Sequence, residues 1–305
     1  MKSLLITGAN GFIGKNLLRS REINNYDVYG TYLTTKPDLK KDNKTKFIKV
    51  DLIKNSELIK LPKKIDYIVH LAGDARTFLD KKFENEQIKN NQKITNNLLK
   101  YAKKTKCIKL IFLSSVYVYS GNTKKIYKEK LKLNPCEPLG KSKIASEQLI
   151  KKFIKLNKIS YLILRAFTIY GQNSRKTQFL PMLKKKIDNK KDKKIIIKKP
   201  EIMRDFLHAN DLVDVINLCL KKKIAKKIYT FNVGFGKSLS IKSVVKKLLK
   251  ISNKQKKLIF LANNKTKNLI GDKNHYADIN KIKKFFKWKP KISINNGLRK
   301  FYEQS

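Results

Sequence analysis

The chain is poor in the residues that build metal and redox centres. Its three cysteines, Cys107, Cys136 and Cys219, are scattered and lack any metal or redox spacing. Its three histidines are isolated from one another, so no metal site can be assembled from them. No apolar stretch approaches the roughly 20 residues that cross a bilayer, and the run that begins at Ser3 is too short for a secretory signal. We therefore expect a cytoplasmic protein with reduced thiols, no metal and no membrane insertion.

Acidic residues are also scarce. The 305 residues include 72 lysines and arginines but only 23 aspartates and glutamates, which gives a formal net charge of +49. Such a charge attracts polyanions, yet the lysines are spread along the whole chain, and Lys, Asn and Ile are over-represented together. No helix-turn-helix, zinc-finger or single-strand-binding motif accompanies the charge. We attribute it to compositional bias and expect no nucleic-acid partner.

The order of the apolar residues indicates the fold class. Short strand-like runs alternate with longer stretches of helical spacing, such as Ile88–Tyr101. The strand candidates are Leu4–Thr7, Asp27–Tyr32, Phe47–Val50, Tyr67–Leu71, Leu110–Ser114 and Tyr161–Leu164. This alternation, with nearly continuous apolar strands, predicts an α/β fold with a doubly wound parallel sheet, the Rossmann fold.

A glycine-rich turn follows the first strand. Gly8, Gly11 and Gly14 are spaced by two residues each, which suits a tight turn, a close approach to a pyrophosphate, and packing of the next helix on the strand. The helix N-terminus adds the positive end of its dipole. We therefore predict a nicotinamide dinucleotide here, held by the three glycines together with Asn10, Phe12 and Ile13.

The end of the second strand bears on the choice of cofactor. An acidic residue at that point bonds the ribose 2′-hydroxyl of NAD, but Thr34, Thr35 and Lys36 stand there instead. Lys36 could receive a 2′-phosphate, which favours NADP, with NAD as the alternative.

After about residue 170 the alternation loosens. The expected helices lie near Thr177–Lys186, Asp211–Leu220, Ile241–Ile251 and Ile279–Phe286, with short strands at Lys194–Ile197 and Tyr229–Val233. We expect residues 1–170 to form the dinucleotide-binding Rossmann domain. Residues 171–305 then form mainly a smaller α/β lobe for the substrate, with some segments returning to the sheet.

A series of short motifs, in order over nearly the whole chain, resembles the nucleotide-sugar branch of the extended short-chain dehydrogenase/reductase family, the NAD-dependent epimerases and dehydratases. The matching segments are Thr7–Gly14, Val50–Leu52, His70–Gly73, Asn91 with Thr95, Ser114–Tyr119, Gly140–Glu147, Arg165–Gly171, Met203–Phe206, Asn232–Gly234 and Trp288–Pro290. The resemblance implies a nucleotide-sugar substrate and a possible homodimer.

The resemblance also implies roles for single residues. Asp51 and Leu52 lie near the adenine, and Leu71 and Ala72 lie along the cofactor. Ser115 matches the catalytic hydroxyl that hydrogen-bonds the sugar oxygen. Lys143 matches the catalytic lysine, which bonds the nicotinamide ribose. The candidates for substrate binding are Asn91, Arg175 and Arg204, and an arginine fork suits a diphosphate.

One position departs from the family. The family places a tyrosine four residues before the lysine, to move a proton on or off the sugar oxygen, and this chain has Leu139 there. General acid–base help is worth about 10²–10⁴-fold in rate. A relocated phenol is one explanation, with Tyr117 first and Tyr119 and Tyr127 behind it. The others are that turnover is lost, or that the reaction needs no strong acid here.

The residues after Ser115 narrow the reaction. Family dehydratases carry an Asp-Glu pair there, because elimination of water needs a separate acid and base, and this chain has Val116 and Tyr117. That argues against a dehydratase. We expect an NAD(P)-dependent nucleotide-sugar epimerase or keto-sugar reductase. The alternative is a catalytically impaired regulator or scaffold that binds the cofactor with the same fold.

Overall fold

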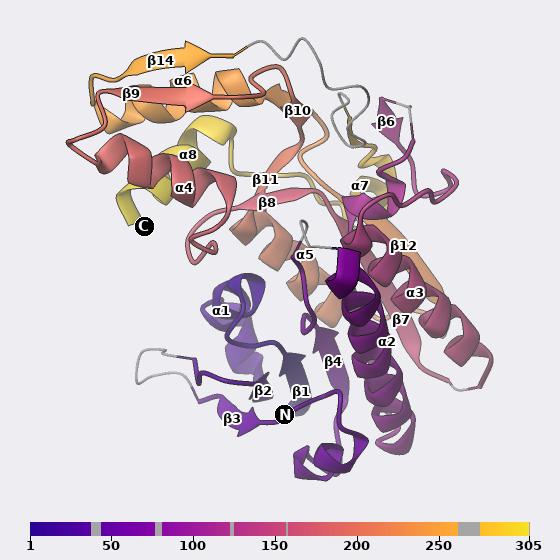
Figure 1. The fold of residues 1–305 in the computed structure, drawn as a ribbon. Coiled ribbons are helices and arrows are strands. Elements are labelled where there is room, and N and C mark those ends of the chain that lie inside the picture. The colour runs from indigo at the N-terminus through magenta and orange to yellow at the C-terminus, as the bar shows by residue number, and fades with distance from the viewer. Residues whose placement is uncertain (38–43, 77–80, 123–124, 157, 262–274, 305) are drawn as a thin grey trace. The chain divides into compact units, whose positions relative to one another are not determined.

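A computed structural model describes residues 1–37, 44–76, 81–122, 125–156, 158–261 and 275–304 (Figure 1). Its internal contacts divide the chain into two units. The first unit contains Met1–Asn122, Lys130–Ala166 and Val213–Phe231, and the second contains Thr123–Glu129, Phe167–Leu212 and Asn232–Ser305. Within the described ranges, no helix is both long and apolar enough to cross a membrane.

A seven-stranded sheet forms the centre of the first unit. Its order is β12-β7-β5-β4-β1-β2-β3, and the pairs β1–β2, β2–β3, β1–β4, β4–β5 and β5–β7 are all parallel. The strands are β1 (Lys2–Thr7), β2 (Tyr26–Tyr32), β3 (Lys46–Lys49), β4 (Tyr67–His70), β5 (Lys109–Ser115), β7 (Ser160–Ala166) and β12 (Ile228–Val233). The strand order reverses between β1 and β4. Ligands of open α/β sheets bind outside the carboxyl ends of the strands at such a point. The predicted doubly wound Rossmann fold is confirmed.

The core of this unit explains why its strands are almost wholly apolar. Leu5 on β1, Ile68 on β4 and Phe112 on β5 are at most 2% exposed and share one cluster with Leu98 and Ile150, which lie on the helices α2 (Lys81–Lys104) and α3 (Pro138–Phe153). Apolar burial of this kind is the main favourable contribution to folding. The remaining helical segments of this part of the chain are α1 (Phe12–Leu18), α5 (Ala209–Lys221) and the 3₁₀ segments Arg21–Asn25, Asn55–Lys60, η3 (Val116–Tyr119) and Ile154–Leu156.

The described residues of the second unit form four two-stranded sheets and a separate core. The pairs are β8 (Thr168–Tyr170) with β11 (Phe206–His208), β9 (Lys194–Ile197) with β14 (Lys257–Phe260), β10 (Met203–Arg204) with β13 (Leu239–Ser240), and β6 (Ile126–Tyr127) with β15 (Tyr276–Ala277). Its helices are α4 (Phe179–Asp188), α6 (Ile241–Ser252), α7 (Asn280–Phe286) and α8 (Ile294–Gln304). Leu183 on α4, Val244 on α6 and Leu298 on α8 pack together in a single cluster.

The structure divides the chain differently from the expected boundary at residue 170. The break falls after Ala166, and Val213–Phe231 returns to the first unit. The segment Tyr229–Val233, expected among the strands after residue 170, belongs to β12 beside β7 in the main sheet. The sequence predicted that some segments after residue 170 return to the sheet but not which ones, because a short apolar strand fits either sheet equally well.

Candidate cofactor and active site

The turn after β1 has the close backbone contacts that its glycines predict. Gly8 has a φ of +69°, in the left-handed region that favours glycine. A Cβ at Gly8 would lie 2.9 Å from the backbone nitrogen of Ala72, and one at Gly14 would lie 2.4 Å from the carbonyl oxygen of Gly8. Side chains at these two positions would push the turn away from β4 and α1 away from the turn.

Gly11 differs from its two neighbours in the motif. A Cβ built there meets only the carbonyl oxygen of Gly8, at 3.1 Å, apart from its own chain neighbours. The space beside Gly11 is therefore less crowded than at Gly8 and Gly14, and a side chain would occupy it. A dinucleotide pyrophosphate needs such a gap next to backbone N–H groups, so the turn fits the cofactor that the sequence predicts.

Hydrogen bonds hold this turn against the strands on either side. The backbone N–H of Ala9 donates to the carbonyl of Thr31, and the Asn10 side-chain amide donates to the carbonyl of Thr35 at 2.8 Å. On the other side, Thr7 Oγ1 accepts the backbone N–H groups of Leu71 and Ala72 at 3.2 and 3.1 Å. Leu71 and Ala72 therefore lie directly beside the glycine turn.

His70, at the end of β4, is a structural histidine in this arrangement. Its Nδ1 lies 3.0 Å from Thr7 Oγ1 and its Nε2 lies 3.3 Å from Thr95 Oγ1. Burial, together with the charge of Lys143, lowers the pKa of His70 to about 3. The imidazole stays neutral at physiological pH and connects β1, β4 and α2.

The residues predicted near the adenine lie after β2 and β3. Leu33, Asp51 and Lys54 line a hollow on the surface, and Asp51 accepts the backbone N–H of Ile53 at 3.0 Å. Leu52 is 6% exposed. Lys36 is exposed and is not among the residues that line this hollow.

Ser115 is the last residue of β5 and the first before η3. Its Oγ accepts the backbone N–H of Tyr117 at 3.3 Å, which caps the 3₁₀ segment. Ser115 and Tyr117 are both half-buried. The cap orients the serine hydroxyl at the carboxyl end of the strand, where a ligand of the sheet would bind.

Lys143 lies on α3 and reaches the same strand. Its Nζ donates to the carbonyl of Leu113 at 2.9 Å and lies 4.9 Å from the centre of the Phe112 ring. Burial lowers the pKa of Lys143 from 10.5 to about 8, against a smaller opposing effect of the Glu147 carboxylate. The structure thus brings the predicted lysine to the strand that ends in the predicted serine.

The start of α3 touches η3 backbone to backbone. A Cβ at Gly140 would lie 2.3 Å from the carbonyl oxygen of Tyr117, so only glycine allows this contact. Leu139, the residue before it, is 5% exposed. The leucine that stands in place of the family tyrosine is therefore a buried part of the first turn of α3.

Sequence reasoning missed a buried polar network behind this site. Arg165 on β7 pairs with Glu147 on α3 at 2.6 Å, and its Nη1 donates to the hydroxyl oxygen of Tyr119 at 2.6 Å. Ser114 donates to the same carboxylate at 2.7 Å. The sequence feature that could have revealed this network is the placement of Arg165 within an apolar strand and of Glu147 among the buried positions of a helix. The network leaves Tyr119 as a structural phenol.

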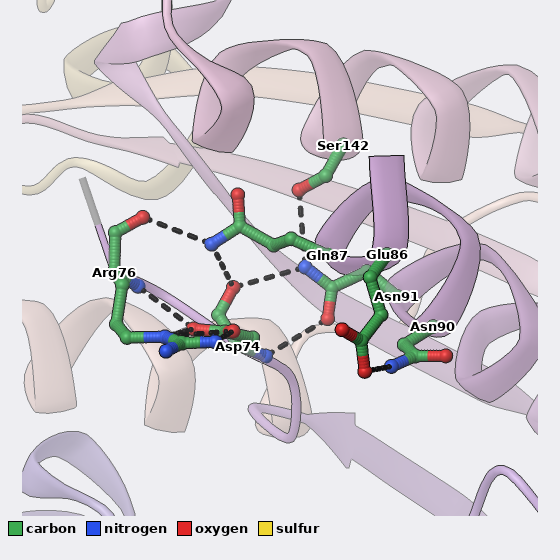
Figure 2. Close-up of polar contacts among 7 residues, drawn as sticks. All are labelled: Asp74, Arg76, Glu86, Gln87, Asn90, Asn91 and Ser142. Carbon is green, nitrogen blue, oxygen red and sulfur yellow. Dashed lines mark hydrogen bonds and ion pairs between the residues drawn. The ribbon is translucent and has the colours of Figure 1, made fainter. Parts of the chain in front are cut away.

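A polar loop follows β4, and Figure 2 shows how it is held. The Asn91 side chain accepts the backbone N–H of Asp74 at 2.8 Å and donates to the Asp74 carbonyl at 2.9 Å and to Ser142 Oγ at 3.0 Å. Asn91 is 6% exposed. Its amide, predicted to bind substrate, is here engaged with the protein and joins the loop to α3.

The other two predicted substrate residues lie in the second unit. Arg175 is exposed and follows β8, and its backbone N–H donates to Gln178 Oε1. Arg204 is half-buried on β10, and its Nη1 donates to the carbonyl of Met203 at 2.8 Å. The neighbouring Asp205 is fully buried and accepts the backbone N–H groups of Phe235, Gly236 and Ala277.

Tyr127 also lies in the second unit and serves its core. It is 2% exposed, and its ring stacks on His275 with centroids 4.9 Å apart and planes 5° apart. Of the three phenols considered from the sequence, Tyr119 and Tyr127 are thus committed to buried packing. Tyr117 is the half-buried one beside Ser115.

Comparison with known proteins supports the same resemblance. Residues 4–234 match the model of the NAD dependent epimerase/dehydratase family. An uncharacterized protein of Methanocaldococcus jannaschii is 30% identical, over 98% of this chain and 95% of its own length. A UDP-glucuronate 4-epimerase of Thermodesulfobacterium geofontis is 29% identical, over 97% of this chain and 95% of its own.

Among solved structures, one from Bacillus cereus is similar over the full length. It is the UDP-glucuronic acid 4-epimerase in complex with UDP-glucuronic acid and NAD, with a TM-score of 0.84 and 29% identity, covering 100% of this chain and 98% of that one.

Proposed function

Because the chain belongs to the NAD dependent epimerase/dehydratase family, a family of enzymes, we propose that it epimerises one carbon of a nucleotide sugar with a bound nicotinamide dinucleotide. One observation carries the proposal. Lys143 reaches the carbonyl of Leu113 at 2.9 Å, on the strand that ends in Ser115, and that strand lies beside β4, next to the glycine turn. The glycine turn, Ser115 and the ammonium of Lys143 are thus associated with the neighbouring strands β1 and β5 on either side of β4, which supports the proposal.

Different residues of the first unit are assigned to different parts of the cofactor. Gly8, Gly11 and Gly14 hold the pyrophosphate, with Asn10, Phe12 and Ile13 completing the turn. Leu71 and Ala72 line the path toward the nicotinamide, and Asp51 and Leu52 lie near the adenine. A bound nicotinamide would supply the acceptor and donor of hydride for the sugar carbon.

Ser115 and Lys143 act at the reacting end. Because Ser115 Oγ accepts the Tyr117 N–H, its own hydrogen is directed to another acceptor, and we assign that acceptor as the sugar oxygen. Lys143 bonds the nicotinamide ribose. A half-buried ammonium also stabilises negative charge that develops on the sugar oxygen, since charges interact more strongly away from bulk water.

Tyr117 is our choice for the proton that the sugar oxygen gains or loses. It stands two residues from Ser115, and its backbone contacts Gly140 next to Leu139, the position at which the family carries its phenol. Tyr119 and Tyr127 are engaged in buried contacts. Loss of turnover with retained binding is the alternative.

We propose NAD as the cofactor. The similar epimerase from Bacillus cereus has NAD bound. A role of Lys36 toward a 2′-phosphate predicts instead that NADP binds more tightly. Arg175 and Arg204 remain candidates for the diphosphate of the sugar nucleotide, because a guanidinium matches phosphate geometry.

A first experiment tests binding and the cofactor together. A true cofactor site stabilises the folded protein by about 2.7 kcal/mol at a ligand concentration about 100-fold above Kd. We expect NAD to raise Tm in a manner that survives added salt, and NADP to do so less. No shift with either dinucleotide would contradict the proposed function.

A second experiment separates the reactions. The NAD-loaded protein is incubated with UDP-glucose, UDP-glucuronate or dTDP-glucose, and the sugar is followed by NMR while absorbance reports reduced cofactor. An epimerase inverts one sugar carbon with no net change in reduced cofactor. A keto-sugar reductase instead consumes NADH or NADPH with a keto sugar. Binding of cofactor and sugar without either change supports the regulator or scaffold.

A further inference from the structure

The loop that follows β4 lies between the two parts of the proposed reaction site. β4 stands between β1, which leads into the glycine turn, and β5, which ends in Ser115. The described part of the loop runs from Leu71, whose backbone N–H is bonded by Thr7, to Arg76. Any ligand at this edge of the sheet therefore passes next to the loop.

Arg76 in this loop has a fixed guanidinium. Its Nε donates to both carboxylate oxygens of Asp74, at 3.0 and 2.9 Å, and its Nη2 donates to the second of them. Asp74 also accepts the backbone N–H of Arg76 at 3.0 Å. One edge of the guanidinium is thus held, while no described residue bonds Nη1.

The exposure of this pair shows that stability is not its main effect. The Arg76 side chain is 58% exposed and that of Asp74 is 25% exposed, and such pairs contribute little free energy to folding. The pairing instead orders a long side chain in advance. A donor fork that is ordered before binding loses less conformational entropy when a ligand arrives.

The choice of arginine is itself informative in this chain. Of its 72 basic residues only seven are arginines, at positions 19, 21, 76, 165, 175, 204 and 299. At some of these positions the planar fork of arginine is used. Arg165 illustrates this, since its guanidinium bonds Glu147 and Tyr119 at once. Lysine offers a point charge and cannot replace such a fork.

An unsatisfied buried atom lies against the same loop. Gln87 on α2 is 2% exposed, and its Nε2 donates to the carbonyls of Asp74 and Arg76 at 3.4 and 2.9 Å. Its Oε1 is buried and has no hydrogen-bond partner among the residues that the structure describes. Figure 2 shows this oxygen pointing away from the two carbonyls. Such an acceptor destabilises the folded protein until a donor reaches it.

The loop is also coupled to the helix that carries Lys143. Asn91 bonds both backbone groups of Asp74 and the hydroxyl of Ser142, and Ser142 donates to the carbonyl of Leu139 at 3.1 Å. Arg76 thus lies two residues after Asp74, whose backbone is connected through Asn91 to Ser142 near the start of α3 (Figure 2).

We propose that the Asp74-braced guanidinium of Arg76 binds an oxyanion of the nucleotide sugar, and that Gln87 Oε1 accepts a hydroxyl hydrogen of the same ligand. The oxyanion is a diphosphate oxygen or the carboxylate of a uronic acid sugar, since both match the fork. The inference rests on the proposed function and assigns the specificity of that site to a loop outside the reacting groups.

The test compares ligand affinities of the NAD-loaded protein and its Arg76→Lys and Arg76→Ala variants. The probes are UDP, UDP-glucose, UDP-glucuronate and dTDP-glucose, measured by calorimetry. Loss of a charge-assisted fork lowers affinity by about 10- to 100-fold. Arg21→Lys is the matched control. Arg21 is exposed in the same unit and precedes β2, so it lies toward the amino ends of the strands, away from the proposed site at their carboxyl ends.

The pattern of losses identifies the oxyanion. Weakening of UDP-glucuronate alone assigns the sugar carboxylate, and equal weakening of all four probes assigns the diphosphate. Unchanged affinities in both variants, or a change confined to NAD, overturn the inference. If wild-type protein binds neither NAD nor any probe, it is the proposed function that fails, so the two failures are distinguishable.

Asp74→Asn tests the brace separately. It keeps an acceptor for the Arg76 backbone but loses the charged two-oxygen acceptor. We expect Asp74→Asn to lower the affinity for the same probes as Arg76→Lys does. The double variant Asp74→Asn with Arg76→Ala should bind the probes no more weakly than Arg76→Ala alone, because Asp74 acts only through the guanidinium. Additive losses in the double variant would mean that Asp74 binds by another route.

Discussion

Arg165 and Glu147 form an ion pair in the interior of the first unit, with Nε to Oε1 at 3.0 Å and Nη2 to Oε2 at 2.6 Å. Their side chains are 4% and 1% exposed. Removing one partner of a buried pair leaves an uncompensated charge, which costs about 3–5 kcal/mol. We expect Arg165→Met to lower the free energy of unfolding by that amount in urea titrations. The control is Lys46→Met, which breaks the exposed pair with Asp27 and should cost at most about 1 kcal/mol. Equal losses in the two variants would show that the buried network does not hold β5, β7 and α3 together.

The glycine turn allows cofactor binding and folding to be separated. Gly14→Ala places a Cβ 2.4 Å from the carbonyl oxygen of Gly8, whereas Gly11→Ala meets only that oxygen, at 3.1 Å. We expect Gly14→Ala to lower Tm markedly. Gly11→Ala should lower Tm less than Gly14→Ala and abolish the stabilisation by NAD, because its methyl group enters the space beside the turn. The measurement is thermal unfolding with and without NAD. Retention of NAD binding in Gly11→Ala would place the pyrophosphate elsewhere.

The pKa of Lys143 predicts a pH dependence of stability. Burial lowers this pKa from 10.5 to about 8 in the folded protein, so between these values the unfolded chain binds more protons. Stability therefore rises with pH across that window. We expect the stability of wild type relative to Lys143→Met to increase from pH 8 to pH 10, as followed by urea unfolding. The amine should also become reactive toward acylating reagents with a midpoint near pH 8 in the absence of cofactor. A constant difference between wild type and variant would show that Lys143 is well solvated.

Leu139 and Tyr117 make the source of the proton testable. If Tyr117 has taken over the phenol's role, Tyr117→Phe should lower the rate of hydride transfer by about 10²–10⁴-fold with little change in NAD affinity. If the phenol is simply missing, Leu139→Tyr should raise the rate and Tyr117→Phe should leave it unchanged. The measurement is the single-turnover reduction of bound NAD by the sugar that the protein binds. Tyr119→Phe serves as the structural control, since its hydroxyl is already bonded by Arg165 and its loss should act on stability.

Local patterns were enough to predict the sheet. The alternation of strand-like and helical segments predicted six strands close to β1, β2, β3, β4, β5 and β7, and the glycine spacing predicted the turn at Gly8. The strands and the turn could be predicted because residues close together in the sequence determine them. A later segment was expected to return to the sheet, but the sequence did not show that this segment is β12 or that it pairs with β7, because strand pairing is set by tertiary contacts.

The tertiary contacts of polar residues were equally beyond the sequence. The substrate-binding role of Asn91 stays a prediction, but the sequence did not indicate that its amide bonds Asp74 and Ser142. Glu147 and Arg165 lie 18 residues apart in the chain, and nothing in either local pattern indicated that they pair. A charged residue among apolar ones signals a buried partner without naming it, since the partner is chosen by the packing of α3 on β7.

The clamp around Asn91 has a consequence for protein engineering. One side chain of α2 bonds the backbone of the loop after β4 and Ser142 near the start of α3, so these three segments are held together. A chimaera can be made by replacing only this loop with that of a relative, in order to change the sugar that the protein accepts. Its side chains on α2 and α3 would then not match the hydrogen-bonding groups of the new loop. Exchanging the loop together with positions 87, 91 and 142 should instead carry the new preference across intact.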